Sequence, residues 1–306
     1  MSINIRQLEA FHAVLETGSV TLAGARLGIT QPAVSKLLKS LSESCGFKLF
    51  TRSGGQMLPT AEARLLSPEV ERLFTGTDRV RRVAEAVREQ RWGSVVIAAP
   101  PALTAHFLPV ALAPILSRQN SIQMTLTSSI SPRIIDLVES HQADIGLSTM
   151  PFFNPNVHCE LVLQYRVECV LPKGHPLAAK PQVRIEDLRN ERMIGMPSHD
   201  CMVMTIDRTF QQVGVPKTSY IQVPMSETAC DFVARGAGVA IVPPFVGRAY
   251  SDEQLLRRPL LPMIETKFWM LMPSGRPKSI AAERLAEAIR DALAPFDVRK
   301  AQDDPA

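Results

Sequence analysis

The chain has 306 residues, a length that usually holds two or more domains, and 45% of them are hydrophobic and 21% charged. This composition excludes a disordered tail, a collagen-like repeat and a disulfide-rich scaffold. The net charge is +4, and residues 1–92 hold thirteen Lys and Arg against nine Asp and Glu, so the excess positive charge lies in the first third. No run of eighteen apolar residues occurs, and the N-terminus is too polar for a signal peptide, which predicts a cytoplasmic protein without membrane contact.

Three short helices are predicted at the N-terminus. The first has apolar residues at positions 8, 11, 14 and 15, the spacing of one helical face, and ends at Gly18. The second begins after Ser19 and ends before Gly28, a residue able to take a positive φ angle. The third begins at Thr30, has Pro32 in its first turn and runs to Leu41.

The third helix has two different faces. The inward face is formed by Val34, Leu37, Leu38 and Leu41, and the opposite face by Gln31, Ser35, Lys36 and Lys39. Short polar groups and cations on one exposed helix suit the major groove of DNA, so the pattern predicts a helix-turn-helix. The alternative is a basic face that is merely solvated.

A hairpin is predicted over 46–60, with Gly54 and Gly55 at its tip. A hairpin after the second helix of a helix-turn-helix is a wing. It would carry Arg52 and Gln56 toward the neighbouring DNA backbone or minor groove.

Four motifs stand out in this segment: Ile5-Arg6-Gln7-Leu8-Glu9-Ala10-Phe11, Gly18-Ser19, Gln31-Pro32-Ala33-Val34-Ser35 and Leu49-Phe50. With them, residues 5–66 resemble the N-terminal domain of LysR-type transcriptional regulators. The resemblance implies a DNA-binding domain over 1–60 whose candidate DNA contacts are Thr30, Gln31, Pro32, Ser35, Lys36, Lys39, Arg52 and Gln56. The sequence departs from the family pattern at Gly24, Ser42 and Cys45, which concerns packing and local charge more than base recognition.

A long helix is predicted over 61–92. Its apolar seam follows alternating steps of four and three residues, the heptad pattern of a dimerisation helix, along Leu66, Val70, Leu73, Thr77, Val80, Ala84 and Val87. The alternative is a helix that lies on its own domain. Pro68 is expected to produce a kink or a new helix start with Ser67 as its cap.

From residue 94 onward, short apolar strands alternate with helices, the pattern of an open α/β sheet. The predicted strands are 94–98, 122–127, 144–148, 165–171, 193–196, 220–223, 239–242 and 267–272. The predicted helices are 104–118, 132–141, 201–213, 226–236 and 278–294. Loops that follow such strands are rich in hydroxyl groups next to helix starts, where an anionic group of a ligand is attracted. Ordinary helix capping is the alternative for any one of these serines.

This segment is similar to the LysR-type effector domain, in which two α/β subdomains of periplasmic-binding-protein type 2 are joined by crossing strands. The matching stretches are Phe107-Leu108-Pro109, Ala143-Asp144-Ile145-Gly146, Leu171-Pro172-Lys173-Gly174-His175-Pro176-Leu177 and Val233-Ala234-Arg235-Gly236-Ala237-Gly238-Val239. The resemblance is strongest to the branch that holds the lysine-biosynthesis activator and the octopine and nopaline regulators. It implies an effector domain over 93–306, with one subdomain at 93–163 and 266–306 and the other at 164–265.

An effector is expected between the two subdomains. The family's cleft positions fall on Thr104, Ser128, Ser129, Ser198, Asp200 and Ser226, and the same loops add Ala102, Ser148 and Met225 as candidates. Asp200 would favour an amino or guanidino group beside a carboxylate, so an amino acid or amino-acid conjugate is the expected effector. The alternative role of Asp200 is a helix cap before residue 201.

Enzyme functions find little support. Asp200, His199 and Cys201 are adjacent and would point apart at a helix start, and no nucleophile elbow or phosphate-binding glycine loop occurs, so no catalytic residue is predicted. The five cysteines have no zinc-binding spacing, so neither a metal nor a cofactor is expected. Two alternatives remain: a redox-responsive regulator that uses Cys201, with Cys230 on the next helix, and a small-molecule binding protein without specific DNA binding. The expected partners are double-stranded DNA with a palindromic site, a small effector and a second copy of the chain, as a dimer or a tetramer.

Overall fold

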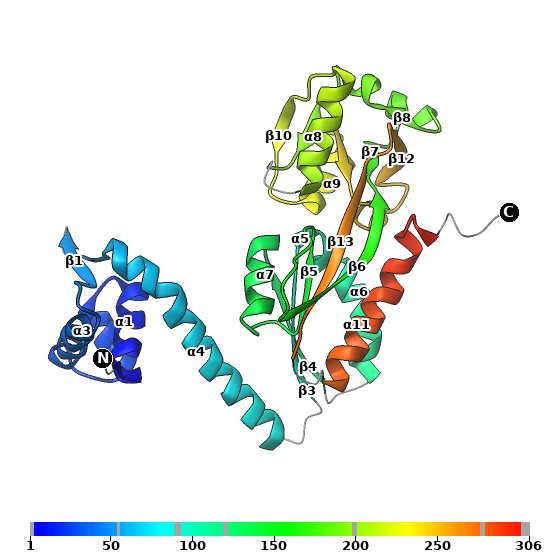
Figure 1. Ribbon diagram of the computed structural model, residues 1–306. Helices are drawn as coiled ribbons and strands as arrows, with labels where there is room; N and C mark the ends of the chain where they lie inside the picture. The colour runs from blue at the N-terminus through cyan, green and yellow to red at the C-terminus, as the bar shows by residue number, and fades with distance from the viewer. Residues whose placement is uncertain are drawn as a thin grey trace. The chain divides into compact units, whose positions relative to one another are not determined.

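The computed structural model describes residues 3–53, 56–88, 93–118, 122–197, 201–275 and 279–300 (Figure 1). The chain divides into two compact units, Met1–Arg82 and Val83–Ala306. Among the described residues, no helix is both long enough and apolar enough to cross a membrane.

The N-terminal unit is a three-helix domain followed by a hairpin. Its elements are α1 (Ile5–Thr17), α2 (Val20–Leu27), α3 (Gln31–Cys45), β1 (Phe50–Ser53), β2 (Gln56–Pro59) and the first part of α4 (Ala61–Arg88). Asn4 and Gln7 form a capping box at the start of α1, and Gly18 ends the helix at a φ of 62°. Phe11, Val34 and Leu41 are fully buried between the helices. The predicted helix-turn-helix and hairpin are therefore present, and α3 extends four residues beyond Leu41.

Helix α4 is continuous through Pro68, so the alternative of a new helix start at this residue is wrong. Thr60 caps the helix instead of Ser67, because its hydroxyl accepts a hydrogen bond from the Ala63 amide at 3.1 Å. Ala63 and Val70 are buried against the N-terminal core on either side of the proline. This packing holds both sides in one helix, although Pro68 has no amide hydrogen for the helical ladder.

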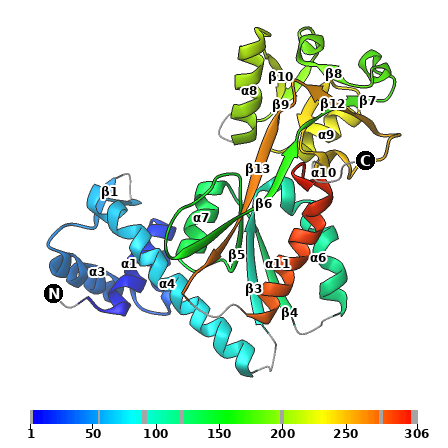
Figure 2. The same cartoon turned by 45° about the vertical axis from the view of Figure 1, so that its right-hand side comes forward.

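The C-terminal unit contains two lobes, each built around one sheet. The sheet of the first lobe has the strand order β4-β3-β5-β13-β6. Its strands are β3 (Gly93–Ala99), β4 (Ile122–Ser128), β5 (Ile145–Ser148), β6 (Val157–Arg166) and β13 (Glu265–Pro273), and its helices are α5 (Pro101–Thr104), α6 (Phe107–Arg118), α7 (Ser131–Glu139) and α11 (Ile280–Leu293). Helix α7 covers one face, and α6 and α11 cover the other (Figures 1 and 2).

The sheet of the second lobe has the strand order β10-β9-β11-β7-β12-β8. Its strands are β7 (Glu168–Pro172), β8 (Val183–Arg184), β9 (Met193–Gly195), β10 (Ser219–Gln222), β11 (Val239–Val242) and β12 (Leu255–Leu261), and its α-helices are α8 (Cys201–Val213), α9 (Ser226–Ala234) and α10 (Pro244–Gly247). Among the described residues of this unit, short 3-10 helices also occur at Pro176–Ala179, Ile185–Leu188 and Ala294–Phe296.

Two chain crossings join the lobes. One lies between β6 and β7 at Val167, and the other follows β12, where Ile264 accepts a hydrogen bond from the Val167 amide at 3.1 Å. Figure 2 shows β6 and β13 running side by side toward the second lobe. The strand predicted at 165–171 is therefore two strands in different sheets, and the sequence patterns also missed most of β6 together with β8 and β12. The helix predicted at 104–118 is interrupted at residues 105–106.

Candidate DNA-binding face and effector pocket

The exposed face of α3 displays the predicted DNA contacts. Gln31, Lys36 and Lys39 are exposed. The side-chain amide of Gln31 donates a hydrogen bond to the Ser35 hydroxyl at 3.2 Å. The Lys39 ammonium lies 3.9 Å from the Glu43 carboxylate, a loose and solvated pair that leaves it available to another anion. Thr30 and Pro32 are also exposed at the start of the helix, and the Thr30 side chain makes no capping hydrogen bond.

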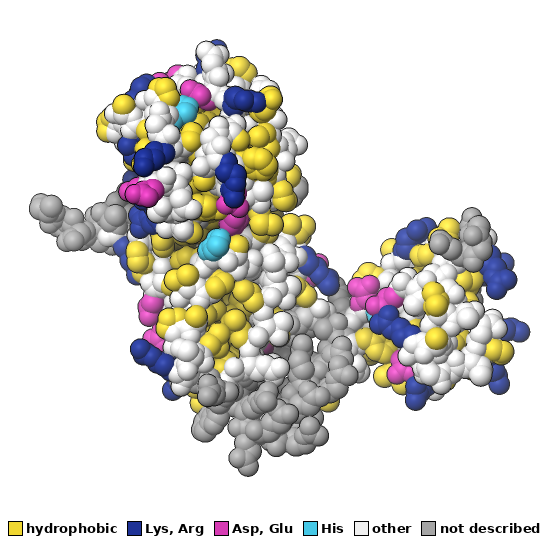
Figure 3. Space-filling view, turned by 180° about the vertical axis from the view of Figure 1, so that it is seen from behind, with side chains coloured by type: hydrophobic (Ala, Val, Ile, Leu, Met, Phe, Trp, Pro, Cys, Tyr) yellow, Lys and Arg dark blue, Asp and Glu magenta, His cyan; other side chains and the backbone are white. Residues whose placement is uncertain are grey.

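The wing is anchored to the helices by its backbone. The Met57 amide donates to the Gly18 carbonyl at 3.0 Å, and the Thr60 amide donates to the Leu49 carbonyl at the same distance. Arg52 is exposed on β1, whereas the side chain of Gln56 and the tip at residues 54–55 lie outside the described residues. Lysine and arginine side chains stand out around the N-terminal unit (Figure 3). This arrangement suits a polyanionic partner.

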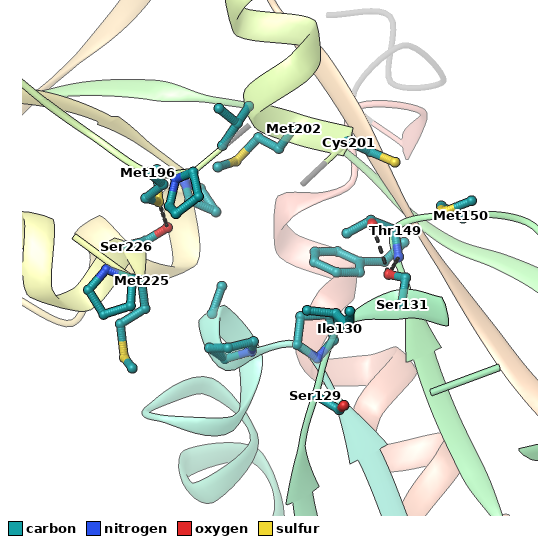
Figure 4. A pocket seen from close by; sticks show the side chains of 18 of the residues that line it. Ser129, Ile130, Ser131, Thr149, Met150, Met196, Cys201, Met202, Met225 and Ser226 are labelled. Atoms are coloured by element: carbon teal, nitrogen blue, oxygen red, sulfur yellow. Dashed lines mark hydrogen bonds between the residues drawn. The ribbon is translucent and has the colours of Figure 1, made fainter. Parts of the chain in front are cut away.

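A pocket of about 130 Å³ lies between the two lobes (Figure 4). The first lobe lines it with Pro100–Ala102, Ser129–Pro132, Thr149 and Met150; the second with Met196, Pro197, Cys201–Val203, Pro224–Ser226 and Pro243; and the crossing strands with Tyr165 and Phe268. The first residues of α7, α8 and α9 are all among them. Helix N-termini carry partial positive charge, so the pocket favours a carboxylate or another anionic group.

Hydroxyl groups of the pocket are partly engaged with one another. The Ser131 and Thr149 hydroxyls lie 2.9 Å apart, and Ser131 Oγ also accepts a hydrogen bond from the Thr149 amide at 3.0 Å. The two residues follow different strands, β4 and β5, so these bonds hold two neighbouring loops together at the pocket. No charged side chain is among the described lining residues.

Sulfur-bearing side chains form much of the remaining wall, a feature that the sequence analysis missed. They are Met150, Met196, Cys201, Met202 and Met225 (Figure 4). The Ser226 hydroxyl donates a hydrogen bond to the Met196 sulfur at 3.1 Å. In this structure the hydroxyl proton is therefore already engaged. Thioethers are polarisable and flexible, so this wall suits an apolar part of a ligand. The sequence carried a signal for this wall, because each of these residues lies within two positions of the end of a strand or the start of a helix.

The predicted effector contacts are only partly brought together. Ala102, Ser129, Met225 and Ser226 line the pocket.

Three other predicted contacts are not among the lining residues. Thr104 and Ser128 are bonded to each other, hydroxyl to hydroxyl, at 3.1 Å. Ser148 is fully buried, and its hydroxyl donates to the Met150 carbonyl at 2.7 Å. Ser198 and Asp200 lie outside the described residues.

The two cysteines considered for redox sensing have different surroundings. Cys201 lines the pocket, whereas Cys230 is fully buried in α9. Burial, together with the nearby carboxylates of Glu227 and Asp231, raises the pKa of the Cys230 thiol to about 12. A thiol of this kind is not a reactive partner at neutral pH. No cluster of three or more His, Cys, Asp or Glu side chains that could hold a metal occurs within the described part of the chain.

Sequence comparisons match two family profiles. The profile described as bacterial regulatory helix-turn-helix protein, lysR family, covers residues 5–64, and the one described as LysR substrate binding domain covers residues 88–294. The regulatory protein NocR of Agrobacterium fabrum (strain C58) is 32% identical over 291 residues, which cover 95% of this chain and 97% of NocR. The octopine catabolism/uptake operon regulatory protein OccR of Rhizobium meliloti is 31% identical over 294 residues, with coverage of 95% and 97%.

A solved structure has a similar fold over nearly the full length. Full-length CbnR, crystallised in complex with its target DNA, has a TM-score of 0.73 at 19% identity, and the alignment covers 94% of this chain and 99% of CbnR. This likeness concerns the fold, and it agrees with a helix-turn-helix unit followed by a two-lobed α/β unit.

Proposed function

Because this chain belongs to the LysR family of DNA-binding transcriptional regulators and is not an enzyme, we propose that it controls transcription in response to an amino acid or an amino-acid conjugate. The observation that carries the proposal is the pocket between the lobes, into which three helix N-termini and several hydroxyls converge. An amino-acid carboxylate suits that polar part, and an apolar chain suits the thioether wall.

The name of one relative is consistent with this class of effector. OccR is described as regulating octopine catabolism and uptake, and octopine is an amino-acid conjugate. Within this proposal, Ser129 and Ser226 are contacts for the polar groups, and Met225 and Ala102 are contacts for the apolar part. Asp200 remains the proposed partner of an amino or guanidino group. Thr104, Ser128, Ser148 and Ser198 remain candidate contacts within this proposal.

The DNA-binding part of the proposal concerns individual residues. We assign base-edge contacts to Gln31 and Ser35, and phosphate contacts to Lys36, Lys39 and Arg52, with Thr30, Pro32 and Gln56 at the margins. The exposed α3 face supports this assignment. We also propose that the functional parts of the chain are 1–60 for DNA binding, 61–92 for dimerisation and 93–306 for effector binding, and that the protein works in the cytoplasm as a dimer or tetramer.

The test is thermal unfolding of the purified protein against a panel of amino acids, opines, dicarboxylates and aromatic acids. A ligand at a hundred times its dissociation constant stabilises a protein by about 2.7 kcal/mol, which moves the unfolding midpoint by several degrees. We expect the shift with a cationic amino acid or an opine. A shift confined to aromatic or dicarboxylic acids would overturn the proposed effector class and leave the regulatory function intact.

Variants locate the ligand once one member of the panel binds. Ser129→Ala and Asp200→Asn should each weaken binding, because each removes a proposed polar contact. Ser117→Ala is the matched control, since Ser117 is exposed at the far end of α6 and is not among the pocket residues. Equal affinity in all three variants would place the effector elsewhere.

The redox alternative rests on the position of Cys201 in the pocket wall. A sensor that used a disulfide between Cys201 and Cys230 conflicts with the burial of Cys230 and its raised pKa. Effector binding is therefore the better supported function of this pocket.

A further inference from the structure

Five aromatic side chains form a cluster where the two lobes and the crossing strands meet. Phe107 and Phe296 come from the first lobe, Tyr165 and Phe268 from β6 and β13, and Phe245 from α10 of the second lobe. The Phe245 ring is the centre of this aromatic cluster, because its centroid lies 5.4 to 6.1 Å from the centroids of the other four rings. Within the described part of the chain, it is the one ring of the cluster that the second lobe contributes.

The packing of the aromatic cluster holds Phe245 in one position. Phe245 is 4% exposed, and the stacked rings of Tyr165 and Phe268 beside it are each 1% exposed. The Phe245 ring meets those of Tyr165 and Phe296 at interplanar angles of 66° and 86°, the T-shaped arrangement that aromatic pairs favour. Packed interiors have discrete arrangements and do not deform continuously. The ring therefore ties α10, and with it the second lobe, to one position on the first lobe.

The aromatic cluster shares residues with the effector pocket. Tyr165 and Phe268 line the pocket from the crossing strands. Pro243, the N-cap of α10 two residues before Phe245, lines it from the second lobe. The Tyr165 hydroxyl also lies 3.9 Å from the sulfur of Met202, a pocket residue in the first turn of α8. Both walls of the pocket therefore rest on the same group of rings.

The chain segment after α11 completes the aromatic cluster. Phe296 is half-buried, and the guanidinium of Arg248 from the second lobe lies 4.8 Å from the centroid of its ring, a cation–π contact between the lobes. Two residues after Phe296, the Val298 amide donates to the backbone carbonyl of Gln164 at 2.8 Å, next to Tyr165 on β6. Phe296 is thus held on the first lobe by the backbone that follows it, while its ring packs on the second lobe.

We propose that Phe245 anchors the second lobe to the first and, together with Phe296 and Arg248, sets the distance between the two walls of the effector pocket. None of these three side chains is among the described pocket residues, so they act as positioning residues and not as ligand contacts. An effector that needs both walls binds in proportion to the fraction of molecules whose walls have the right spacing. The aromatic cluster therefore controls the affinity for any effector of this pocket, whatever its chemical class.

The first test measures the distance between the lobes by double electron–electron resonance in the full-length protein. Spin labels are attached through unnatural amino acids at Arg133 of α7 and Arg208 of α8, which are exposed and belong to different lobes. Labelled chains are diluted with unlabelled chains, so that only distances within one chain are measured. Phe296→Ala should broaden the distance distribution by about twofold, because Phe245 then loses one of the rings that surround it. Phe296→Tyr keeps the ring and should retain the wild-type width.

Leu116→Ala is the matched control for this measurement. Leu116 is a partly buried residue of α6 in the same lobe and is not part of the aromatic cluster. Its truncation should lower stability without changing the distance distribution. The proposal is overturned if wild type and Phe296→Ala have equal widths, or if Leu116→Ala broadens the distribution as much.

The second test changes an exposed residue, so it does not depend on a substitution in the core. Arg248→Ala removes the cation from the second lobe, and amide hydrogen exchange is measured at Val298 in the first lobe. The Val298 amide should exchange about threefold faster, as expected for the loss of an exposed cation–π contact. Arg235→Ala is the control, because it removes the same charge from an exposed position on α9 of the second lobe. Unchanged exchange in Arg248→Ala, or an equal increase in Arg235→Ala, contradicts a contact that couples the lobes.

Discussion

Lys36 and Lys39 lie on the exposed face of α3, and this position gives the DNA-binding proposal its sharpest test. Each lysine that contacts a phosphate releases about one counterion, so Lys36→Ala should reduce the slope of log affinity against log salt by about one unit. Gln31→Ala should instead relax sequence preference with little change in slope. Both effects are measured by fluorescence anisotropy across a salt series.

Lys173→Ala is the control, because it removes the same charge from an exposed loop of the second lobe. The assignment of the α3 face to phosphate contacts would be refuted if the salt slope is unchanged in Lys36→Ala. It would also be refuted if Lys173→Ala reduces the salt slope by the same amount.

Ser131 links two pocket loops through its hydroxyl. It is 7% exposed and is bonded to both the side chain and the amide of Thr149. Ser131→Ala leaves these groups without their partner, so we expect it to lower the free energy of unfolding by about 1–3 kcal/mol. Urea denaturation measures this loss. The more exposed Thr104–Ser128 bond provides the comparison, and Thr104→Ala should cost less.

Helix α4 is continuous although it contains Pro68. A proline inside a helix removes one backbone hydrogen bond and is about 3 kcal/mol less favourable than alanine. Packing of Ala63 and Val70 compensates for this penalty, so Pro68→Ala should stabilise the N-terminal unit by up to about 3 kcal/mol. A rise in the thermal midpoint is the expected result, and a fall would mean that Pro68 has a packing role that alanine cannot fill.

The two halves of α4 have different surroundings. In the first half, Ala63 and Val70 pack on the N-terminal core, which agrees in part with the alternative of a helix lying on its own domain. Farther along, Leu73 is 42% exposed and Val80 is 70% exposed within the same seam. An exposed apolar seam of heptad spacing is suited to a second copy of the helix.

Val80→Glu therefore should weaken self-association by at least about tenfold, because it places a charge in the proposed seam. Analytical ultracentrifugation over a concentration series measures the effect. Leu65→Glu alters another exposed residue of α4 outside the seam and should have a smaller effect. Identical dissociation constants for wild type and Val80→Glu would show that dimerisation uses another surface.

The segment after α11 ties the end of the described chain back to the first sheet. Asp297 is 5% exposed, pairs with Arg299 at 2.6 Å and accepts a hydrogen bond from the Gln164 amide of β6. Burial opposes ionisation of Asp297, but its hydrogen bonds with Arg299 outweigh this effect and lower the pKa of the carboxyl group. The Asp297 side chain therefore connects the end of the described chain to β6, which lies far from it in the sequence.

A carboxyl group whose pKa is lowered by folding stabilises the protein above its unfolded pKa of about 3.9, and this contribution is lost as the pH falls through the folded pKa. Asp297→Asn should thus lower the free energy of unfolding by about 1–2 kcal/mol at pH 7, a value reduced because Arg299 is partly exposed. The difference from wild type should shrink as the pH falls toward 4 and below. Urea denaturation at several pH values checks this, and a difference independent of pH would contradict the role of the charge.

Local sequence patterns were sufficient to predict several structural elements of this protein. The helix-turn-helix depends on spacing and caps within 45 residues, and the resemblance to the LysR family and the two-lobed fold are confirmed by the comparisons. The exposed lysines of α3 could be read directly, because one face of a helix is fixed by the period of the helix itself. For the same reason, most helices of the C-terminal unit were predicted close to their observed bounds.

Tertiary packing decided the rest. Whether Pro68 breaks its helix depends on what Ala63 and Val70 contact, and whether a strand stays in one sheet depends on where Val167 crosses between lobes. Ser129 lines the pocket, whereas the buried Ser148 hydrogen-bonds within its own loop, although Ser129 directly follows β4 and Ser148 ends β5. Sequence spacing fixes which face of an element a residue occupies, but long-range packing fixes what that face meets.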